Sequence, residues 1–282
     1  MPRFDLHAHS THSDGLLTPA GLVQRAAVRG VDVLALTDHD ELSGLAEAKA
    51  QAAISGLRLI GGVEVSVSWR EITLHVLALG IDPGCPTLCE GLAAIRTGRL
   101  ERARRIGDSL AEAGIPGAYE GALQFVTSER LISRTHFARF LVQAGHVREM
   151  RDVFKRYLVR GKPGHVEHTW ATLPEAIDWI HAAGGRSVLA HPGRYKATPT
   201  AMRELLAEFR DAGGAGTAGG PSRRRCLGAD RPRRTVGTLR SGGCRGRLAA
   251  TAHCWRRSVR ELAGHHAACP GLADRSRLSG TA

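Results

Sequence analysis

The sequence predicts an α/β fold in which helices alternate with short, buried strands. Residues 31–36 form an apolar run directly after a helix-like segment, and the same order recurs over residues 43–67 and 173–190. Nearly continuous apolar runs are typical of strands that are covered on both faces. Repeated helix–strand units favour a parallel sheet, whose functional side chains collect at the carboxyl ends of the strands.

The first helix is predicted between Thr18 and Arg29. Thr18 is a favourable N-cap, and Pro19 suits the first helical position, where an N–H would have no partner in any case. Gly30 ends the helix, as glycine commonly does after a last helical turn. A second, alanine-rich helix is expected from Ser43 to about residue 53.

Strands are predicted at residues 31–36, 57–67, 73–79 and 187–190, and each carries or precedes a titratable side chain. The first leads into Thr37-Asp38-His39-Asp40. The second contains Glu64 and the third His75, whereas the fourth ends in His191. Strand ends are therefore where we expect the chemistry of this chain to lie.

Between residues 88 and 157 the pattern changes to helices without strands, with helices expected at 97–113, 135–144 and 147–157. Further helices are expected at 173–183 and 199–212. We therefore divide the chain into an α/β body (residues 1–97 and 166–212), a helical insertion (98–165) that caps the active site, and a tail (213–282).

The segment from Asp5 to Asp14 places three histidines and two carboxylates within ten residues. Side chains two positions apart in a strand lie on the same face, so His7 and His9 are expected to project together. Asp14 follows after a turn with Gly15 and is close enough to supply an oxygen ligand. The segment is thus a candidate for one wall of a metal site.

Metal-binding residue types recur downstream near the predicted strand ends. A carboxylate inside an apolar strand, such as Glu64, is costly to bury without a partner. Imidazole nitrogens combined with carboxylate oxygens suit Zn, Mn or Fe, and a glutamate can bridge two ions. The candidate metal ligands are His7, His9, Asp14, His39, Glu64, His75 and His191.

The motifs His7-Ala8-His9, Thr37-Asp38-His39-Asp40 and Ala190-His191-Pro192, with Glu64 and His75 between them, resemble the successive motifs of the polymerase and histidinol phosphatase (PHP) family. The resemblance covers about residues 1–212. It implies a distorted (β/α)7-type barrel with a helical insertion. It also implies two or three divalent metal ions as cofactors, with manganese expected and zinc or iron as alternatives.

Two further segments, residues 133–139 and 161–163, resemble a bacterial branch of this family that acts on nucleoside 3',5'-bisphosphates and trims short RNA from its 5' end. In such enzymes a water molecule activated by the metal ions attacks phosphorus, so no catalytic side chain is expected to act as nucleophile. Asp5 and Asp38 are expected to orient metal-binding imidazoles. The cationic candidates for holding substrate phosphates are Arg134, whose guanidinium can bind a phosphate bidentately, His136, Lys162 and Arg194.

The net charge of +12 resides in the tail. Residues 1–212 hold 25 Lys and Arg against 24 Asp and Glu, whereas residues 213–282 hold 14 Arg and 3 acids. The pI of the whole chain therefore does not indicate a nucleic-acid-binding surface on the α/β body. No apolar run approaches the roughly 18 residues of a membrane span, and no signal-peptide core follows Met1. We expect a cytoplasmic protein without membrane contact.

The tail departs from the family pattern. The family's last metal motif, Asp-x-His, is missing from residues 213–282, which contain no Ile, no Phe and only two Val. A packed α/β terminus needs branched apolar residues to bury. We therefore expect the last barrel elements to be missing or non-native, and the activity of this chain to be weak or absent.

Three interpretations of the tail are open: a disordered basic arm that binds RNA, a folded terminus, or translation in a shifted frame from about residues 213–217. The abrupt loss of Lys, Ile and Phe favours the frameshift. Translating the other two frames downstream of Ala212 tests it. Finding no strand followed by Asp-x-His in either frame would refute it.

The predicted function is hydrolysis of phosphate from nucleotides, such as nucleoside 3',5'-bisphosphates, or from short 5'-phosphorylated oligonucleotides. The enzymatic alternative is a histidinol-phosphate-type phosphatase of small molecules on the same scaffold, against which the insertion with Arg134 argues. The alternative of another class is a non-catalytic RNA-binding protein that uses the basic tail. Deleting residues 213–282 separates the enzyme from the binder, because a binder would lose RNA affinity whereas a damaged enzyme would change little.

Overall fold

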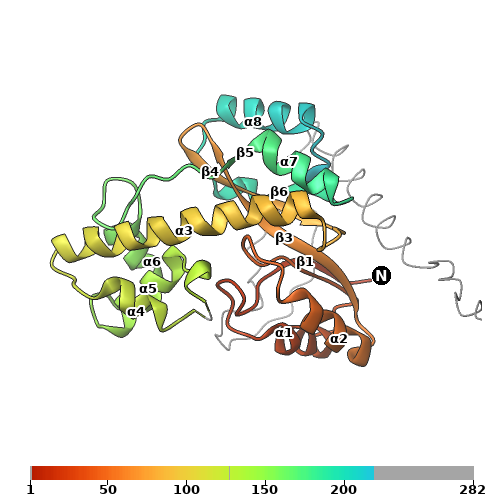
Figure 1. The fold of residues 1–282 in the computed structure, drawn as a ribbon, viewed down its shortest axis with the longest axis horizontal. Coiled ribbons are helices and arrows are strands. Elements are labelled where there is room, and N and C mark those ends of the chain that lie inside the picture. The colour runs from red at the N-terminus through yellow and green to blue at the C-terminus, as the bar shows by residue number, and fades with distance from the viewer. Residues whose placement is uncertain (1, 127, 219–282) are drawn as a thin grey trace, which may run out of the picture. The chain divides into compact units, whose positions relative to one another are not determined.

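A computed structural model of the chain describes residues 2–126 and 128–218 (Figure 1). The described residues form helices and a sheet in the alternating order expected of an α/β protein, so the predicted fold class is confirmed. No helix among them is long and apolar enough to cross a membrane. The predictions for the tail concern residues that lie outside the described part of the chain from position 219 onward.

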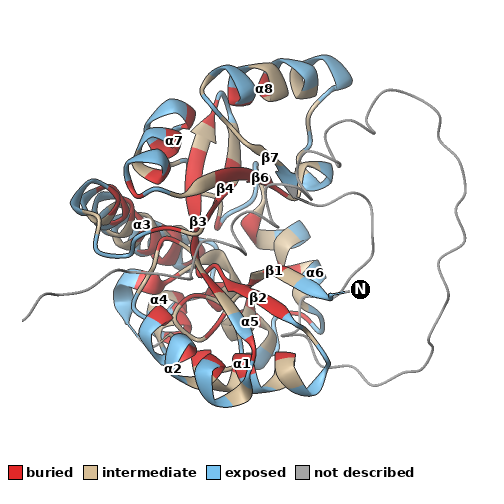
Figure 2. Cartoon of the chain, turned by 90° about the vertical axis from the view of Figure 1, so that its right-hand side faces the viewer, coloured by how far each residue is buried: buried red, intermediate tan, exposed pale blue. Residues whose placement is uncertain are grey.

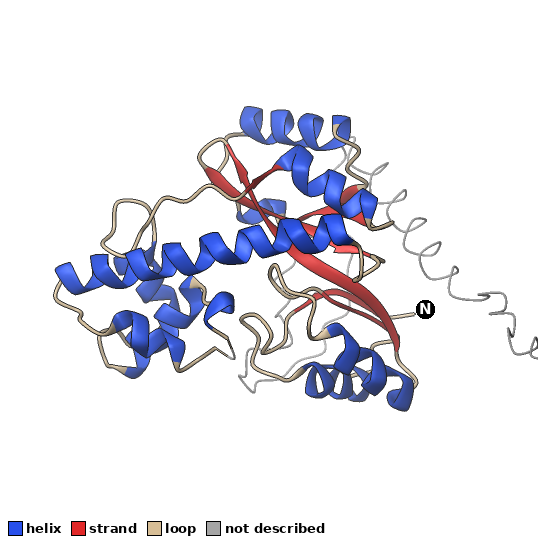
Figure 3. Cartoon of the chain, in the orientation of Figure 1, coloured by secondary structure: helices blue, strands red, loops and turns tan. Residues whose placement is uncertain are grey.

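The described strands, red in Figure 3, form one sheet in the order β1-β2-β3-β4-β6-β7, with β5 paired to β3. Strands β1, β2 and β3 are mutually parallel, and so are β6 and β7. The strands are β1 (Phe4–Ala8), β2 (Val33–Leu36), β3 (Arg58–Trp69), β4 (Ile72–Leu79), β5 (Ala171–Thr172), β6 (Arg186–Ala190) and β7 (Gly216–Ala218).

Strand β4 is antiparallel to both of its neighbours, which corrects the expectation of a parallel sheet. β3 and β4 form a hairpin whose turn contains Arg70, with φ 52°, and Glu71. So short a connection can join only antiparallel strands, because a parallel neighbour needs a crossover of a dozen or more residues. The reversal places His75, near the start of β4, opposite Ser66 of β3.

Strand β7 was not expected from the sequence. It pairs with β6 through Val188↔Gly216 and Ala190↔Ala218, and Ala215 N–H donates to Ser187 O just before it. Its residues are small and unbranched except for one threonine, so no apolar pattern announces it. The last strand predicted from the sequence ends at residue 190, and this short pairing lies at the start of the segment assigned to the tail.

Helices cover the sheet and build a second layer beyond it (Figure 1). The helix expected from residue 97 begins at Pro86, a residue favoured at the first helical position. The helix expected at 147–157 is a short α-helix followed by a π-helical turn. The helices are α1 (Pro19–Val28), α2 (Leu45–Ser55), α3 (Pro86–Glu112), α4 (Ala118–Leu123), α5 (Arg134–Gln143), α6 (Met150–Val153), α7 (Leu173–Ala182) and α8 (Pro199–Asp211), with the short turns η1 (Glu129–Leu131), η2 (Phe154–Leu158) and η3 (Pro192–Arg194).

Helix α3 belongs to two hydrophobic cores, whose buried residues are red in Figure 2. Its first half packs Leu88 and Leu92 into the core between the sheet and α7. Its second half packs Ile106 and Leu110 into a core with Phe137 and the other helices of the insertion. The proposed boundary at residue 98 thus falls within one continuous helix, α3. This helix connects the sheet to the helical insertion.

A capping box begins α7. Thr172 N–H donates to Glu175 Oε2 at 2.8 Å, and Glu175 N–H donates to Thr172 Oγ1 at 3.4 Å. These bonds satisfy N–H groups that have no partner within the helix. We expect Thr172→Ala to lower the free energy of unfolding by about 1 kcal/mol, measured by urea denaturation. The exposed Thr200 of α8 is the control, and equal losses in Thr172→Ala and Thr200→Ala would contradict the role of the cap.

Candidate metal centre

Glu64 lies at the centre of a ring of histidines. Its side chain is only 1% exposed and projects from the middle of β3. Oε2 lies 2.8 Å from His7 Nε2 and 3.1 Å from His9 Nε2. Oε1 lies 3.1 Å from His75 Nδ1 and 3.1 Å from His191 Nε2. The two oxygens of one carboxylate therefore face two different sets of imidazoles.

Asp14 and His39 extend the cluster on one side. His39 Nδ1 is 3.5 Å from Glu64 Oε2, and its Nε2 is 4.0 Å from Asp14 Oδ1. Asp14 Oδ1 is also 3.9 Å from His9 Nδ1. The ligand atoms form three overlapping groups, each within 4.8 Å: His7 with His9 and Glu64, His9 with Asp14 and His39, and His39 with Glu64 and His75.

The register of the sheet brings these residues together. His7 lies in β1 and His9 directly after it, and His39 follows β2 and forms an isolated parallel bridge with Glu64. His191 follows β6 with φ 31°, a left-handed conformation uncommon for a residue other than glycine. All seven predicted ligands thus lie in one cluster, although they come from five separate segments of the chain.

The electrostatics of the cluster favour a bound cation. Burial raises the pKa of the Glu64 carboxyl, but the facing His39 and His75 imidazoles hold it well below its usual value. Burial lowers the pKa of His9, whereas its hydrogen bond and charge interaction with Glu64 raise it to about 9. The negative charge that Glu64 presents to His9 is one that a bound divalent cation would also balance, with release of the proton from His9.

Two buried imidazole nitrogens in the cluster have no hydrogen-bond partner among the described residues. His75 Nδ1 is 3.1 Å from Glu64 Oε1 without hydrogen-bond geometry, and the buried Nδ1 of His191 has no partner among the described residues. Buried polar atoms are nearly always hydrogen-bonded, and those that are not call for an explanation such as an ion. The donor set of imidazole nitrogens and carboxylate oxygens fits divalent metal ions.

Asp14 and His39 hold the charge states that metal ligands require. Burial raises the pKa of Asp14, but His39, His9 and the Thr135 hydroxyl together lower it to about 2. Burial lowers the pKa of His39 to about 3. At neutral pH the carboxylate is therefore ionised and the imidazole neutral, with a lone pair free to bind a metal.

Asp38, which was predicted to orient an imidazole, makes its side-chain hydrogen bonds to two serines. Its carboxylate accepts hydrogen bonds from the Ser10 amide and hydroxyl and from the Ser13 hydroxyl, at 2.6–2.7 Å. Ser13 Oγ lies 3.4 Å from His9 Nδ1, so Asp38 acts on His9 through this serine. Asp5, the other predicted orienting residue, is held against the backbone of His7, while burial raises its pKa.

The helical part of the chain reaches the cluster through α5. Thr135 Oγ1 donates to Asp14 Oδ2 at 3.1 Å, and Arg139 Nη2 donates to the backbone carbonyl of Asp14 at 2.6 Å. Oδ1 of the same carboxylate remains directed at the histidines. Helix α5 thus holds a candidate metal ligand in place.

The four predicted substrate-binding residues lie in different environments. Arg134 is half-buried at the start of α5 and donates to Leu158 O at 3.4 Å. His136 is fully buried, and its Nδ1 accepts from Ser133 N–H at 3.0 Å; burial lowers its pKa to about 4, so it stays neutral. His136 therefore caps α5 and does not offer a cation to phosphate. Lys162 and Arg194 are exposed.

Two arginines that the sequence analysis did not single out lie near Arg134, and we call Arg99, Arg102 and Arg134 the cationic cluster. Burial, together with Arg134 and Arg99, lowers the pKa of Arg102 to about 9. Burial and Arg99 also lower the pKa of Arg134. Arg99 and Arg102 both stack over Trp170, at 5.0 and 5.5 Å from the ring centroid. Their i, i+3 spacing on α3 was the available sequence signal.

Tyr195 was also missed. Its hydroxyl accepts from His75 N–H at 2.9 Å and donates to Ala190 O at 2.8 Å. It therefore joins β4 to β6 at His75 and at Ala190, the residue before His191. No local sequence pattern indicates this contact, because it links residues 120 positions apart.

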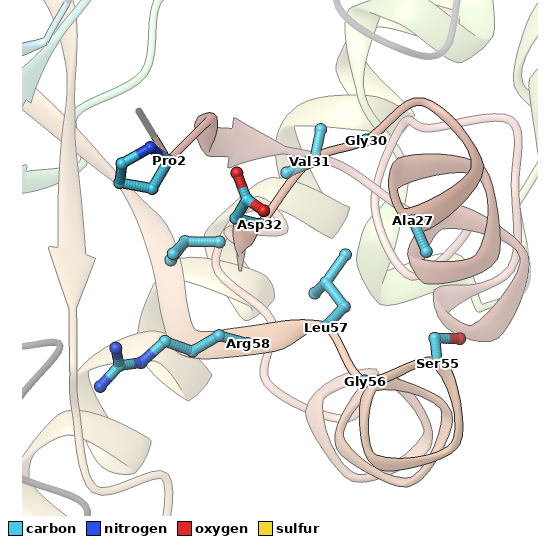
Figure 4. A pocket seen from close by; sticks show the side chains of 10 residues that line it. Pro2, Ala27, Gly30, Val31, Asp32, Ser55, Gly56, Leu57 and Arg58 are labelled. Carbon is cyan, nitrogen blue, oxygen red and sulfur yellow. The ribbon is translucent and has the colours of Figure 1, made fainter.

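A pocket of about 500 Å³ lies at the amino-terminal ends of β2 and β3 (Figure 4). It is lined by Asp32 and Val33 at the start of β2 and by Leu57 and Arg58 at the start of β3. None of the candidate metal ligands lines it. In parallel α/β folds this end of the strands serves stability more often than catalysis, so the pocket is separate from the metal centre.

Comparison with known proteins supports this picture. Residues 5–158 match the model of the PHP domain. The chain is 54% identical over 216 residues, 77% of this chain and 76% of the relative, to a 3',5'-nucleoside bisphosphate phosphatase of Chromobacterium violaceum. It is 47% identical over 210 residues, 74% of this chain and 71% of the relative, to the 5'-3' exoribonuclease Rnm of Escherichia coli.

Two solved structures share the fold. One, described as an amidohydrolase from Chromobacterium violaceum with bound sulfate and no metal, has a TM-score of 0.75 at 53% identity and covers 76% of each chain. The other, a metal-dependent phosphoesterase from Bifidobacterium adolescentis, has a TM-score of 0.71 at 29% identity and covers 77% of this chain and 76% of its own. Taken with the matched domain and the histidine cluster around Glu64, these similarities show that the chain belongs to the PHP family.

Proposed function

We propose that this chain hydrolyses phosphate esters of nucleotides at a centre of two or three divalent metal ions. The observation that carries the proposal is a single buried carboxylate, Glu64, whose two oxygens face separate sets of imidazoles. Such a carboxylate is suited to bridge two cations. The names of the two curated relatives, a nucleoside bisphosphate phosphatase and an exoribonuclease, support a nucleotide or short oligonucleotide as substrate.

The residues would divide between the ions according to which carboxylate oxygen each imidazole faces. His7, His9 and Glu64 would hold one ion, and Asp14 and His39 would supply two of the ligands of a second ion. His75 and His191 would share the other oxygen of Glu64 with a further ion. The bound ions would act as Lewis acids that activate water and neutralise phosphate charge. Manganese is the proposed metal, with zinc or iron as alternatives.

The cationic cluster would bind a phosphate group of the substrate. Among the described residues, Arg102 and Arg134 donate only to the backbone carbonyls of Val166 and Leu158 and form no ion pair with a carboxylate. Burial and repulsion within the cationic cluster lower the pKa of both Arg102 and Arg134, so an arriving anion would relieve the repulsion. A planar guanidinium matches a phosphate bidentately. Lys162 and Arg194 remain weaker candidates at the surface.

A panel of phosphate esters tests the proposal. With Mn²⁺, we expect kcat/KM for a nucleoside 3',5'-bisphosphate to exceed that for histidinol phosphate at least about tenfold, a difference of about 1.4 kcal/mol. A 5'-phosphorylated oligoribonucleotide should also be cleaved. EDTA should abolish phosphate release from each substrate. Activity that persists in EDTA, or a preference for histidinol phosphate, would contradict the proposal.

The missing Asp-x-His motif sets the expected level of activity. Residues 213–282 lack this pair of ligands, so one ion should bind weakly and turnover should be low. The matched control is the Chromobacterium violaceum relative, assayed side by side under the same Mn²⁺ concentrations. Equal turnover of the two proteins would show that the tail does not limit catalysis.

A further inference from the structure

Asp40 is a buried carboxylate that the proposed mechanism does not use. It is fully buried, and its φ of 53° places it in the left-handed region that residues other than glycine seldom adopt. Oδ1 accepts from Ser66 N–H at 2.7 Å, and Oδ2 accepts from Ser66 Oγ at 2.8 Å and from Arg99 Nη2. A strained conformation of this kind persists only where the surroundings over-determine it.

Asp40 contacts β3 at two positions, the backbone of Glu64 and the side chain of Ser66. Ser66 lies two residues after Glu64 in β3 and therefore on the same face of the strand. Asp40 N–H donates to Glu64 O at 3.1 Å, and Glu64 N–H donates to Asp38 O at 3.0 Å. The loop after β2 thus holds β3 at Glu64 itself and at the next residue on the same face.

The same residue anchors helix α3. Arg96 Nη1 donates to the Asp40 backbone carbonyl at 2.7 Å. Arg99, one turn further along, reaches the Asp40 carboxylate, and its Nη2 also lies 3.0 Å from Ser66 Oγ. Arg99 belongs to the cationic cluster with Arg102. Asp40 is therefore where the cationic cluster is joined to the strand that carries Glu64.

We propose that Asp40 is a positioning residue that fixes the Glu64 carboxylate between its two sets of imidazoles. It acts through Ser66 and through the backbone of Glu64, and it contacts no candidate metal ligand with its own side chain. The inference rests on the proposed metal centre. By binding Arg99, the same carboxylate also sets the position of the cationic cluster relative to that centre.

Titration of the metal-free full-length protein with Mn²⁺, followed by calorimetry, tests this role without measuring activity. We expect Asp40→Asn to weaken Mn²⁺ binding at least about tenfold, because partners one layer outside metal ligands typically contribute 10- to 100-fold to affinity. Ser66→Ala should weaken it several-fold. The matched control is Ser68→Ala: Ser68 lies on the same face of β3, but its hydroxyl accepts from Trp170 N–H at 2.8 Å and not from the Asp40 network.

Circular dichroism and the thermal midpoint establish that each variant is folded. If Asp40→Asn does not fold, Ser66→Ala against Ser68→Ala decides the question alone. Folded variants that bind Mn²⁺ as tightly as the wild type would overturn the proposal, and so would equal losses in Ser66→Ala and Ser68→Ala, since both remove one hydrogen-bonding hydroxyl. A wild-type protein that binds no Mn²⁺ would instead contradict the proposed metal centre itself.

Discussion

Glu64→Gln is expected to remove phosphoesterase activity and most of the Mn²⁺ affinity of this chain. The amide keeps the shape of the side chain but loses the negative charge that faces five imidazoles. We expect a loss of at least about 100-fold in kcat/KM, since partners one layer further out already contribute up to about that much. Phosphate release and Mn²⁺ calorimetry on the same preparations measure the two effects.

The control for Glu64→Gln is Glu71→Gln, which makes the same chemical change in the hairpin at the end of β3. The Glu71 side chain is 75% exposed and pairs with Arg160 at the surface. It should leave both activity and metal affinity unchanged. If Glu64→Gln retained wild-type Mn²⁺ affinity, Glu64 would not be a shared ligand and the metal centre as we describe it would be wrong.

Arg134→Met is expected to raise KM for a nucleoside bisphosphate roughly 10- to 100-fold, because one hydrogen bond to a charged group is worth about 1.5–3 kcal/mol. Methionine keeps most of the apolar stem and removes the guanidinium. Arg134 contacts none of the candidate metal ligands in the structure, so Mn²⁺ affinity should not change. Steady-state kinetics with saturating Mn²⁺ separate KM from kcat.

The matched control for Arg134→Met is Arg104→Met, which removes an arginine from the exposed face of α3. It should change KM less than twofold. A lower kcat with an unchanged KM in Arg134→Met would argue against a phosphate-binding role for Arg134. Equal increases in KM for the two variants would show that the general positive charge of this region, and not a specific contact, attracts the substrate.

Much of the fold could be predicted because its signals are local. Thr18 and Pro19 mark the start of α1, and Thr18 Oγ1 accepts from Gly21 N–H at 3.1 Å as an N-cap should. The apolar run before His39 forms a strand buried along its whole length. Strand β7 and the early start of α3 at Pro86 could not be found in this way, since small residues and a mixed-polarity helix carry weak patterns.

The candidate site was predictable to the level of residue types and not of contacts. Asp38 was expected to orient an imidazole, but it holds Ser10 and Ser13 and reaches His9 only through Ser13. His136 was expected to contact phosphate, but it is buried as a cap of α5. Both differences arise because a motif states which groups are near each other in sequence, whereas hydrogen-bond partners depend on how the loops between strands pack.

By itself, the sequence determined which side chains could serve as ligands, because the two-residue period of a strand and the apolar runs before His39 and His191 are local properties. Only the tertiary structure decided that Glu64 offers one oxygen to His7 and His9 and the other to His75 and His191. It likewise decided that Asp40 joins α3 to β3. The physical reason is that strand register and helix packing are set by contacts across the whole chain, which no local pattern encodes.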